Sequence, residues 1–327
     1  MRILVTGGAG FVGSHLCERF LRSGHDLIVI DNFNSLYDPA LKRYNCEQIA
    51  RTAVAEGQSY LLCEGDIRDG NFVSAVFAQE EPEAVIHVAA MAGVRPSIDN
   101  PLLYEEVNVR GTLNLLEAAR ATGVRPFIFA SSSSVYGNNP KVPFAEADPV
   151  DNPISPYAAT KKAGELLCHT YHHLYGMSIA CLRFFTVYGP RQRPDLAITK
   201  FTRLILARKP IPLYGDGLTS RDYTYIDDIV DGVVRALKWV CEEDSRYDIF
   251  NLGGSRPVEL QRLVEVIEEA CGVKALVTRL PMQPGDVQMT YADLDKSAAI
   301  LGYEAKTAIE DGIDLFVRWC RENPVAQ

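Results

Sequence analysis

The chain has 327 residues, of which 47% are hydrophobic and 23% charged, a composition typical of a globular protein with a sizeable core. Its net charge of −9 at pH 7 disfavours nucleic acid and anionic membranes as partners, and its apolar runs fall short of the roughly 18 residues that span a bilayer. The eight cysteines are scattered without a CxxC pair, so we expect free thiols and a cytoplasmic protein.

The first residues predict a buried strand, a glycine-rich turn and a helix. Gly7, Gly10 and Gly13 follow an apolar run at three-residue intervals, and helical apolar spacing begins at Phe11. A turn of this kind directs backbone N–H groups at a pyrophosphate, which the helix dipole also attracts. We therefore expect a dinucleotide site formed by the three glycines, Phe11 and Val12.

An acidic residue ends the second predicted strand about 20 residues beyond the glycines. A carboxylate at this position, Asp31, accepts hydrogen bonds from the ribose hydroxyls and repels a 2′-phosphate. The sequence therefore predicts NAD in preference to NADP, with Asn32 beside the same ribose.

Short apolar runs alternate with helical patterns over the first half of the chain, which is typical of βαβ units and a parallel sheet. The strands are expected at 3–5, 27–30, 60–63, 84–88, 127–130 and 179–185, and the helices near 11–23, 71–80, 104–122 and 157–175. Further helices are expected near 198–208, 226–241, 258–271 and 308–322, among loops rich in Arg, Gly and Pro.

This pattern predicts an α/β protein with a Rossmann-type doubly wound parallel sheet and a smaller mixed α/β domain. We expect residues 1–182 to form the dinucleotide-binding domain and residues 183–327 the substrate-binding domain. Segments near 220–252 are expected to return to the first domain. Ligands would lie in the cleft beyond the carboxyl ends of the strands.

A serine cluster and a tyrosine–lysine pair carry the predicted chemistry. Four serines end the fifth strand, and Tyr157 and Lys161 share one face of a later helix, a single turn apart. A nearby ammonium and the positive nicotinamide ring would lower the tyrosine pKa from about 10, so that Tyr157 could take a hydroxyl proton. Ser132 would hold the same hydroxyl. The alternative is an exposed helical pair and a polar turn.

Together, the glycine turn, the serine cluster and the Tyr-x-x-x-Lys pair resemble the extended short-chain dehydrogenase/reductase family, and within it the nucleotide-sugar epimerases and dehydratases. The runs at 155–165 and 182–195 are similar to those of UDP-glucuronate 4-epimerases. The resemblance implies NAD, a UDP-sugar substrate and a homodimer formed through helices that match 104–122 and 157–175. It also implies further cofactor contacts at Asp66 and Ile67, which match the adenine site, and at Ala89, Ala90 and Asn108.

The resemblance also separates the reactions of this family. Dehydratases place an acidic pair, and decarboxylases a glutamate, where this chain has Ser133 and Ser134. Because elimination of water needs an acid and a base close to the sugar, hydroxyls favour epimerisation at carbon 4 through a 4-keto intermediate. We expect interconversion of UDP-glucuronate and UDP-galacturonate. A UDP-glucose 4-epimerase, a UDP-glucuronate decarboxylase and a non-enzymatic NAD or nucleotide-sugar sensor remain alternatives.

A further group of residues is assigned to the sugar nucleotide. The resemblance assigns the sugar carboxylate to Ser133, Ser134 and Thr186, with Arg193 nearby, because hydroxyls and guanidinium groups donate to carboxylates. Arg221 is expected at the diphosphate, with Arg191, Arg193 and Arg279 as further candidates. The remaining assignments are Arg95, Tyr214 and Asp286. The histidines at 169, 172 and 173 lack a downstream acid, and we expect no metal site.

Overall fold

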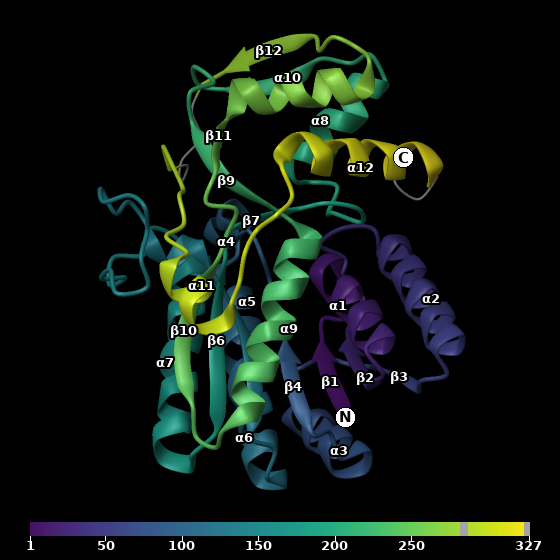
Figure 1. The fold of residues 1–327 in the computed structure, drawn as a ribbon, viewed down its shortest axis with the longest axis vertical. Helices are drawn as coiled ribbons and strands as arrows, with labels where there is room; N and C mark the ends of the chain where they lie inside the picture. The colour runs from purple at the N-terminus through teal and green to yellow at the C-terminus, as the bar shows by residue number, and fades with distance from the viewer. Residues whose placement is uncertain (282–286, 324–327) are drawn as a thin grey trace.

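A seven-stranded parallel sheet is the centre of the computed structural model, which describes residues 1–281 and 287–323 (Figure 1). The strand order is β3-β2-β1-β4-β5-β6-β10, so the order reverses between β1 and β4, where ligands bind in sheets of this kind. The predicted Rossmann-type α/β fold is confirmed. The strands are β1 (Arg2–Thr6), β2 (Asp26–Asp31), β3 (Tyr60–Glu64), β4 (Ala84–His87), β5 (Pro126–Ser132), β6 (Ser178–Phe184) and β10 (Tyr247–Leu252).

Helices cover both faces of this sheet. Successive strand residues point to opposite faces, so Ile3 and Val5 pack with one set of helices and Leu4 with the other. The first set is α1 (Phe11–Arg22), α2 (Pro39–Glu56) and α9 (Ile226–Glu242), and the second is α3 (Gly70–Glu80), α6 (Gly111–Thr122) and α7 (Pro156–Tyr175).

The α2 helix is a difference from the sequence analysis, which expects no helix between 30 and 60. Asp38 caps it by accepting a hydrogen bond from Ala40, Pro39 occupies its first position and Gly57 ends it in the left-handed conformation. Leu41, Asn45 and Ile49 are buried at four-residue intervals. This narrow buried stripe, which includes a polar residue, gives a weak apolar pattern.

The helix expected at 104–122 is longer and irregular. It follows α4 (Val94–Asp99) and consists of α5 (Pro101–Glu105), a π-helical turn (Glu106–Arg110) and α6. A π-helical turn often marks a functional site. Here it includes Asn108, which bonds to the loop after β4.

The smaller lobe lies at the end of the sheet where the strands finish, at the top of Figure 1. It has a three-stranded sheet, β7 (Thr186–Tyr188), β9 (Ser220–Tyr225) and β11 (Pro257–Glu259), and a two-stranded sheet, β8 (Ile211–Tyr214) and β12 (Val277–Leu280). Its helices are α8 (Ala197–Leu206), α10 (Leu260–Cys271) and α12 (Ile309–Glu322), and α11 (Asp295–Leu301) packs beside β10. Within the expected 220–252 segment, α9 and β10 lie with the large sheet, whereas the exact domain division stays a prediction.

All eight cysteines are free. In the described ranges, no helix combines the length and the apolarity that a membrane crossing requires.

Candidate active site

A pocket of about 510 Å³ lies at the carboxyl ends of the central strands, between the large sheet and the smaller lobe. Residues from the turn after β1 to the segment after β12 line it, so the fold brings together groups that are far apart in sequence. The predicted residues that line this pocket are Gly7, Gly10, Phe11, Val12, Gly13, Asp31, Asn32, Asp66, Ile67, Ala89, Ala90, Ser132, Ser133, Ser134, Tyr157, Lys161, Thr186, Arg193 and Arg221.

The glycine turn forms a cradle that side chains would fill. Gly7 has a φ of +70°, and a Cβ at Gly13 would lie only 2.2 Å from the Gly7 carbonyl oxygen. A Cβ at Gly10 would meet that oxygen at 3.1 Å and otherwise only the Tyr37 hydroxyl at 4.0 Å. Because α1 begins here and has no acidic residue in its first turn, its N-terminus attracts an anion. The turn therefore fits a dinucleotide pyrophosphate.

Asp31 lies at the end of β2 with its carboxylate already held in place. It accepts hydrogen bonds from the backbone of Ala9 at 3.2 Å and of Phe33 at 2.9 Å. Lys42 of α2 lies 3.5 Å from the same carboxylate and, with Tyr37, lines the pocket. Neither residue is predicted from the sequence, because Lys42 lies on α2 and Tyr37 directly precedes the cap of this helix. The available signal was Asp38 followed by Pro39, which is a typical helix start.

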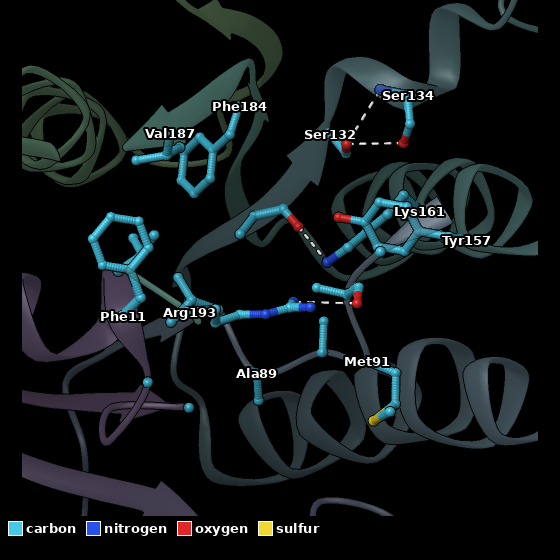
Figure 2. Close-up of a pocket in the computed structure, with 18 of the residues that line it drawn as sticks. Phe11, Ala89, Met91, Ser132, Ser134, Tyr157, Lys161, Phe184, Val187 and Arg193 are labelled. Carbon is cyan, nitrogen blue, oxygen red and sulfur yellow. Dashed lines mark hydrogen bonds between the residues drawn. The ribbon is translucent and has the colours of Figure 1, made fainter. Parts of the chain in front are cut away.

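The tyrosine–lysine pair enters the pocket from the start of α7 (Figure 2). Ser155 caps this helix by accepting a hydrogen bond from Ala158 at 3.1 Å. The Lys161 ammonium donates to the Ala130 carbonyl oxygen at 2.7 Å, and burial lowers its pKa to about 8. One turn of α7 thus sets the spacing of the pair, and the hydrogen bond to β5 fixes the position of the lysine ammonium.

Burial raises the pKa of Tyr157, whereas hydrogen bonding to Ser132 and the positive charge of Arg193 oppose this rise. The expected lowering of this pKa involves Lys161 together with the nicotinamide ring of bound NAD, and it stays a prediction. The nearby cation that acts on the phenol is Arg193, which extends into the pocket from the opposite side in Figure 2.

The serine turn presents hydroxyls to the pocket. Strand β5 ends at Ser132, and a short 3₁₀ helix (Ser133–Tyr136) follows. Ser134 donates its hydroxyl to that of Ser132 at 2.8 Å, and its backbone N–H donates to the same oxygen at 3.2 Å. Ser132, Ser133 and Ser134 all line the pocket, and Ser132 interacts with the phenol of Tyr157.

Two arginines line the pocket in the described part of the chain. Arg193 donates to the Ala92 carbonyl oxygen at 3.2 Å and pairs with Asp195 at 2.7 Å. Arg221 lies on β9 of the smaller lobe. The other two arginine candidates bond elsewhere. Arg191 pairs with Glu18 at 2.6 Å, and Arg279 donates to the Asp216 carbonyl oxygen at 3.0 Å.

Some assigned residues lie away from this pocket. Asn108 does not line it, and its amide instead bonds the Met91 backbone and Thr160, which ties the loop after β4 to α7. Arg95 and Tyr214 do not line it either, and the Arg95 guanidinium lies 5.2 Å from the centre of the Tyr214 ring. Asp286 lies outside the described residues. Among those that are described, no group of side chains has the arrangement of a metal site.

A glycine cradle at the switch point of a Rossmann-type sheet, facing a Tyr-Lys pair, defines a dinucleotide-binding protein of the short-chain dehydrogenase/reductase type. Residues 3–253 match the model of the NAD dependent epimerase/dehydratase family, and the chain belongs to this family.

Relatives and solved structures cover nearly the whole chain. The UDP-glucuronate 4-epimerase of Thermodesulfobacterium geofontis is 42% identical over 98% of this chain and 96% of its own length. A Bacillus cereus UDP-glucuronic acid 4-epimerase, solved with UDP-glucuronic acid and NAD, has a TM-score of 0.89 and 34% identity over 98% of this chain and 99% of its own. A Thermotoga maritima UDP-glucose 4-epimerase solved with UDP-glucose has a TM-score of 0.88 and 34% identity over 98% of this chain and 99% of its own.

Proposed function

We propose that this protein is an NAD-dependent 4-epimerase that interconverts UDP-glucuronate and UDP-galacturonate. The observation that carries this proposal is that Tyr157, Lys161 and the serine turn face one pocket that also contains the glycine cradle. The relatives named UDP-glucuronate 4-epimerase support the same reaction and substrate.

We assign each step of this reaction to particular residues of the pocket. The glycine turn and Asp31 would hold NAD, which when bound supplies a reversible hydride acceptor for carbon 4 of the sugar. Tyr157 would take the proton of the 4-hydroxyl group, which Ser132 holds, and later return it to the ketone oxygen. The charge of Arg193 favours the phenolate that this transfer requires, and Lys161 would bind the nicotinamide ribose.

The acid sugar poses a chemical problem that the pocket addresses. Its 4-keto intermediate is a β-keto acid, which loses carbon dioxide when the bond to the carboxylate aligns with the carbonyl π system. Ser133, Ser134 and Thr186 would hold the carboxylate away from this alignment, with Arg193 adding a positive charge.

The distribution of acids in the pocket favours epimerisation over dehydration and decarboxylation. In the described part of the lining, the acidic residues are Asp31, which ends β2, and Asp66, which follows β3, both on the dinucleotide side, and no glutamate contributes. A carboxylate sugar would therefore meet hydroxyls and guanidinium groups without a repelling charge. An acid for the elimination of water is missing from the serine turn.

The test is incubation of the protein and NAD with UDP-glucuronate, followed by proton NMR of the sugar. Inversion at carbon 4 is expected, and an unchanged spectrum would refute the proposal. UDP-glucose and UDP-xylose belong in the same panel, because the likeness to a UDP-glucose 4-epimerase keeps the neutral sugar as the second candidate. Carbon dioxide as the main product would instead identify a decarboxylase.

We also propose a homodimer that forms through α6 and α7. Large apolar side chains are exposed on these helices and on the neighbouring α5, namely Leu102, Leu113, Leu166 and Leu174. Light scattering should give twice the mass of the chain. A monomer at micromolar concentration would contradict this proposal.

The free thiols suit a reducing compartment, and we propose the cytoplasm as the location. Cell fractionation with an antibody against the chain tests this, and recovery outside the cytoplasmic fraction would contradict it.

A further inference from the structure

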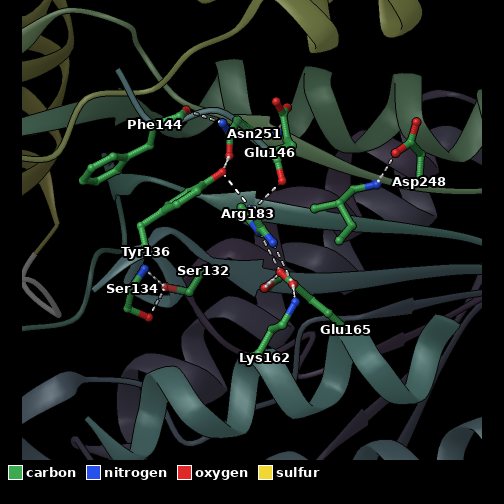
Figure 3. A network of polar contacts seen from close by, with 12 residues as sticks. Ser132, Ser134, Tyr136, Phe144, Glu146, Lys162, Glu165, Arg183, Asp248 and Asn251 are labelled. Carbon is green, nitrogen blue, oxygen red and sulfur yellow. Dashed lines mark hydrogen bonds and ion pairs between the residues drawn. The ribbon is translucent and has the colours of Figure 1, made fainter. Parts of the chain in front are cut away.

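A buried polar cluster lies beneath the serine turn and outside the pocket lining (Figure 3). Its centre is Arg183 of β6, whose side chain is 1% exposed. The guanidinium donates to both oxygens of Glu165 at 2.8 and 2.9 Å and to the Tyr136 hydroxyl at 2.9 Å. The Tyr136 hydroxyl in turn donates to the Asn251 side-chain oxygen at 2.7 Å. The cluster thus joins the serine turn to α7, β6 and β10.

This cluster holds the serine turn at both ends. Ser131, directly before Ser132, donates its hydroxyl to Glu165 at 2.7 Å. Tyr136 ends the 3₁₀ helix that follows, and its ring stacks on that of Phe144 with the centres 4.8 Å apart. The residues between these two anchors, Ser132 to Ser134, present the hydroxyls that line the pocket.

The Glu165 carboxylate is paired with cations inside this cluster. Burial alone would raise the pKa of the Glu165 carboxyl, but the hydrogen bonds and charge of Arg183, with the hydroxyl of Ser131, bring it below its usual value. Lys162 adds a second cation at 3.5 Å from Glu165. Burial of an ion pair costs desolvation energy, and a well-packed apolar replacement is often as stable. A gain in stability therefore does not explain why a charged cluster is buried here, whereas the need to fix the geometry of the serine turn does.

We propose that Tyr136, Glu165 and Arg183 are positioning residues that fix the serine turn and thereby determine how the 4-keto intermediate partitions between epimer and carbon dioxide. This inference rests on the proposed function. When the turn is displaced, the sugar carboxylate can rotate until the bond between carbons 5 and 6 aligns with the carbonyl group. The electron pair of that bond then moves to form an enolate, carbon dioxide leaves, and carbon 5 takes a proton. No additional oxidant or reductant is needed.

Tyr136→Phe is the most selective variant, because it removes only the hydroxyl and keeps the ring stacked on Phe144. The lost hydrogen bonds to Arg183 and Asn251 free the end of the turn without a change in the pocket lining. The matched control is Tyr171→Phe. Tyr171 is also buried, on α7, but its hydroxyl donates to Glu117, away from the serine turn.

The measurement uses the full-length enzyme with NAD and UDP-glucuronate labelled with ¹³C at the carboxylate, and counts labelled bicarbonate against UDP-galacturonate. We expect Tyr136→Phe, which loses two buried hydrogen bonds, to raise the ratio of carbon dioxide to epimer roughly tenfold, while Tyr171→Phe leaves the ratio unchanged. Glu165→Gln, which keeps the shape and removes the charge, should raise the same ratio and is the second variant if Tyr136→Phe folds poorly.

The outcomes separate the two proposals. If the wild type epimerises UDP-glucuronate and the product ratio is unchanged in folded Tyr136→Phe and Glu165→Gln, the positioning role alone is overturned. This holds even if the turnover of both variants falls. A wild-type protein that leaves carbon 4 of UDP-glucuronate unchanged would overturn the proposed function, and this inference with it.

Discussion

Gly13→Ala tests whether the glycine turn is as tight as the structure shows. The new Cβ would lie 2.2 Å from the Gly7 carbonyl oxygen, 2.7 Å from the Gly8 Cα and 2.8 Å from the Gly7 carbonyl carbon, whereas ordinary contacts begin at 3.4 Å. All three atoms belong to the backbone, so α1 must move away from the turn. Overpacking of this kind costs about 3 kcal/mol of folding free energy, at the upper end of the usual range, and opens the cradle.

Gly10→Ala is the matched comparison. Its Cβ would meet the Gly7 oxygen at 3.1 Å and then only the Tyr37 hydroxyl at 4.0 Å, so it fills the cradle with a small effect on the fold. Urea unfolding and calorimetric titration with NAD measure the two effects. Gly13→Ala should lose both stability and NAD affinity, and Gly10→Ala mainly affinity. Wild-type stability in Gly13→Ala would refute the packing argument, and wild-type NAD affinity in Gly10→Ala would refute the cradle.

Three further predictions concern the catalytic tyrosine, the cofactor and pH. Tyr157→Phe should lower the turnover of UDP-glucuronate about 10³-fold with NAD affinity preserved, since general acid–base catalysis is worth 10²- to 10⁴-fold, and a loss below tenfold would contradict its role as the base. Asp31→Ser should reduce the preference for NAD over NADP because the charge that repels a 2′-phosphate is gone while Lys42 remains, and an unchanged ratio of the two dissociation constants would exclude this assignment. Burial lowers the pKa of His15 and of His87 to about 3, whereas the pKa of a histidine in the unfolded chain is about 6.5. Between pH 6.5 and 3 the unfolded state therefore binds more protons, so the free energy of unfolding decreases as the pH falls. From pH 6.5 to 5 each histidine should cost about 2 kcal/mol, and urea unfolding of His87→Gln should show a shallower pH dependence than the wild type, unlike a variant of the exposed His173.

Local sequence patterns were sufficient to predict most of the large sheet. Its inner strands are short apolar runs, and the glycine turn, the acid that ends β2 and the Tyr-Lys spacing are signals that lie within a few residues of one another. The α2 helix has a local start signal in Asp38 and Pro39, but its apolar pattern is weak because it buries a narrow stripe that includes Asn45. As a consequence, Lys42 and Tyr37 were not predicted as part of the pocket.

The electrostatics of the site depend on tertiary contacts. The sequence places Lys161 one turn from Tyr157, but in the fold the Lys161 ammonium donates to the Ala130 carbonyl oxygen. The positive charge that acts on the Tyr157 phenol is that of Arg193. The cluster beneath the serine turn had one local signal. An arginine near the end of an apolar strand, Arg183, needs a buried partner, but spacing alone could not identify Glu165 as that partner.

The most direct test of the central claim uses UDP-glucuronate deuterated at carbon 4, in ordinary water with the enzyme and NAD. If one pocket removes hydrogen from that carbon and delivers the same atom to the opposite face, the UDP-galacturonate formed keeps its deuterium, and NMR and mass spectrometry show full retention. Replacement of deuterium by solvent hydrogen in the product would contradict the account.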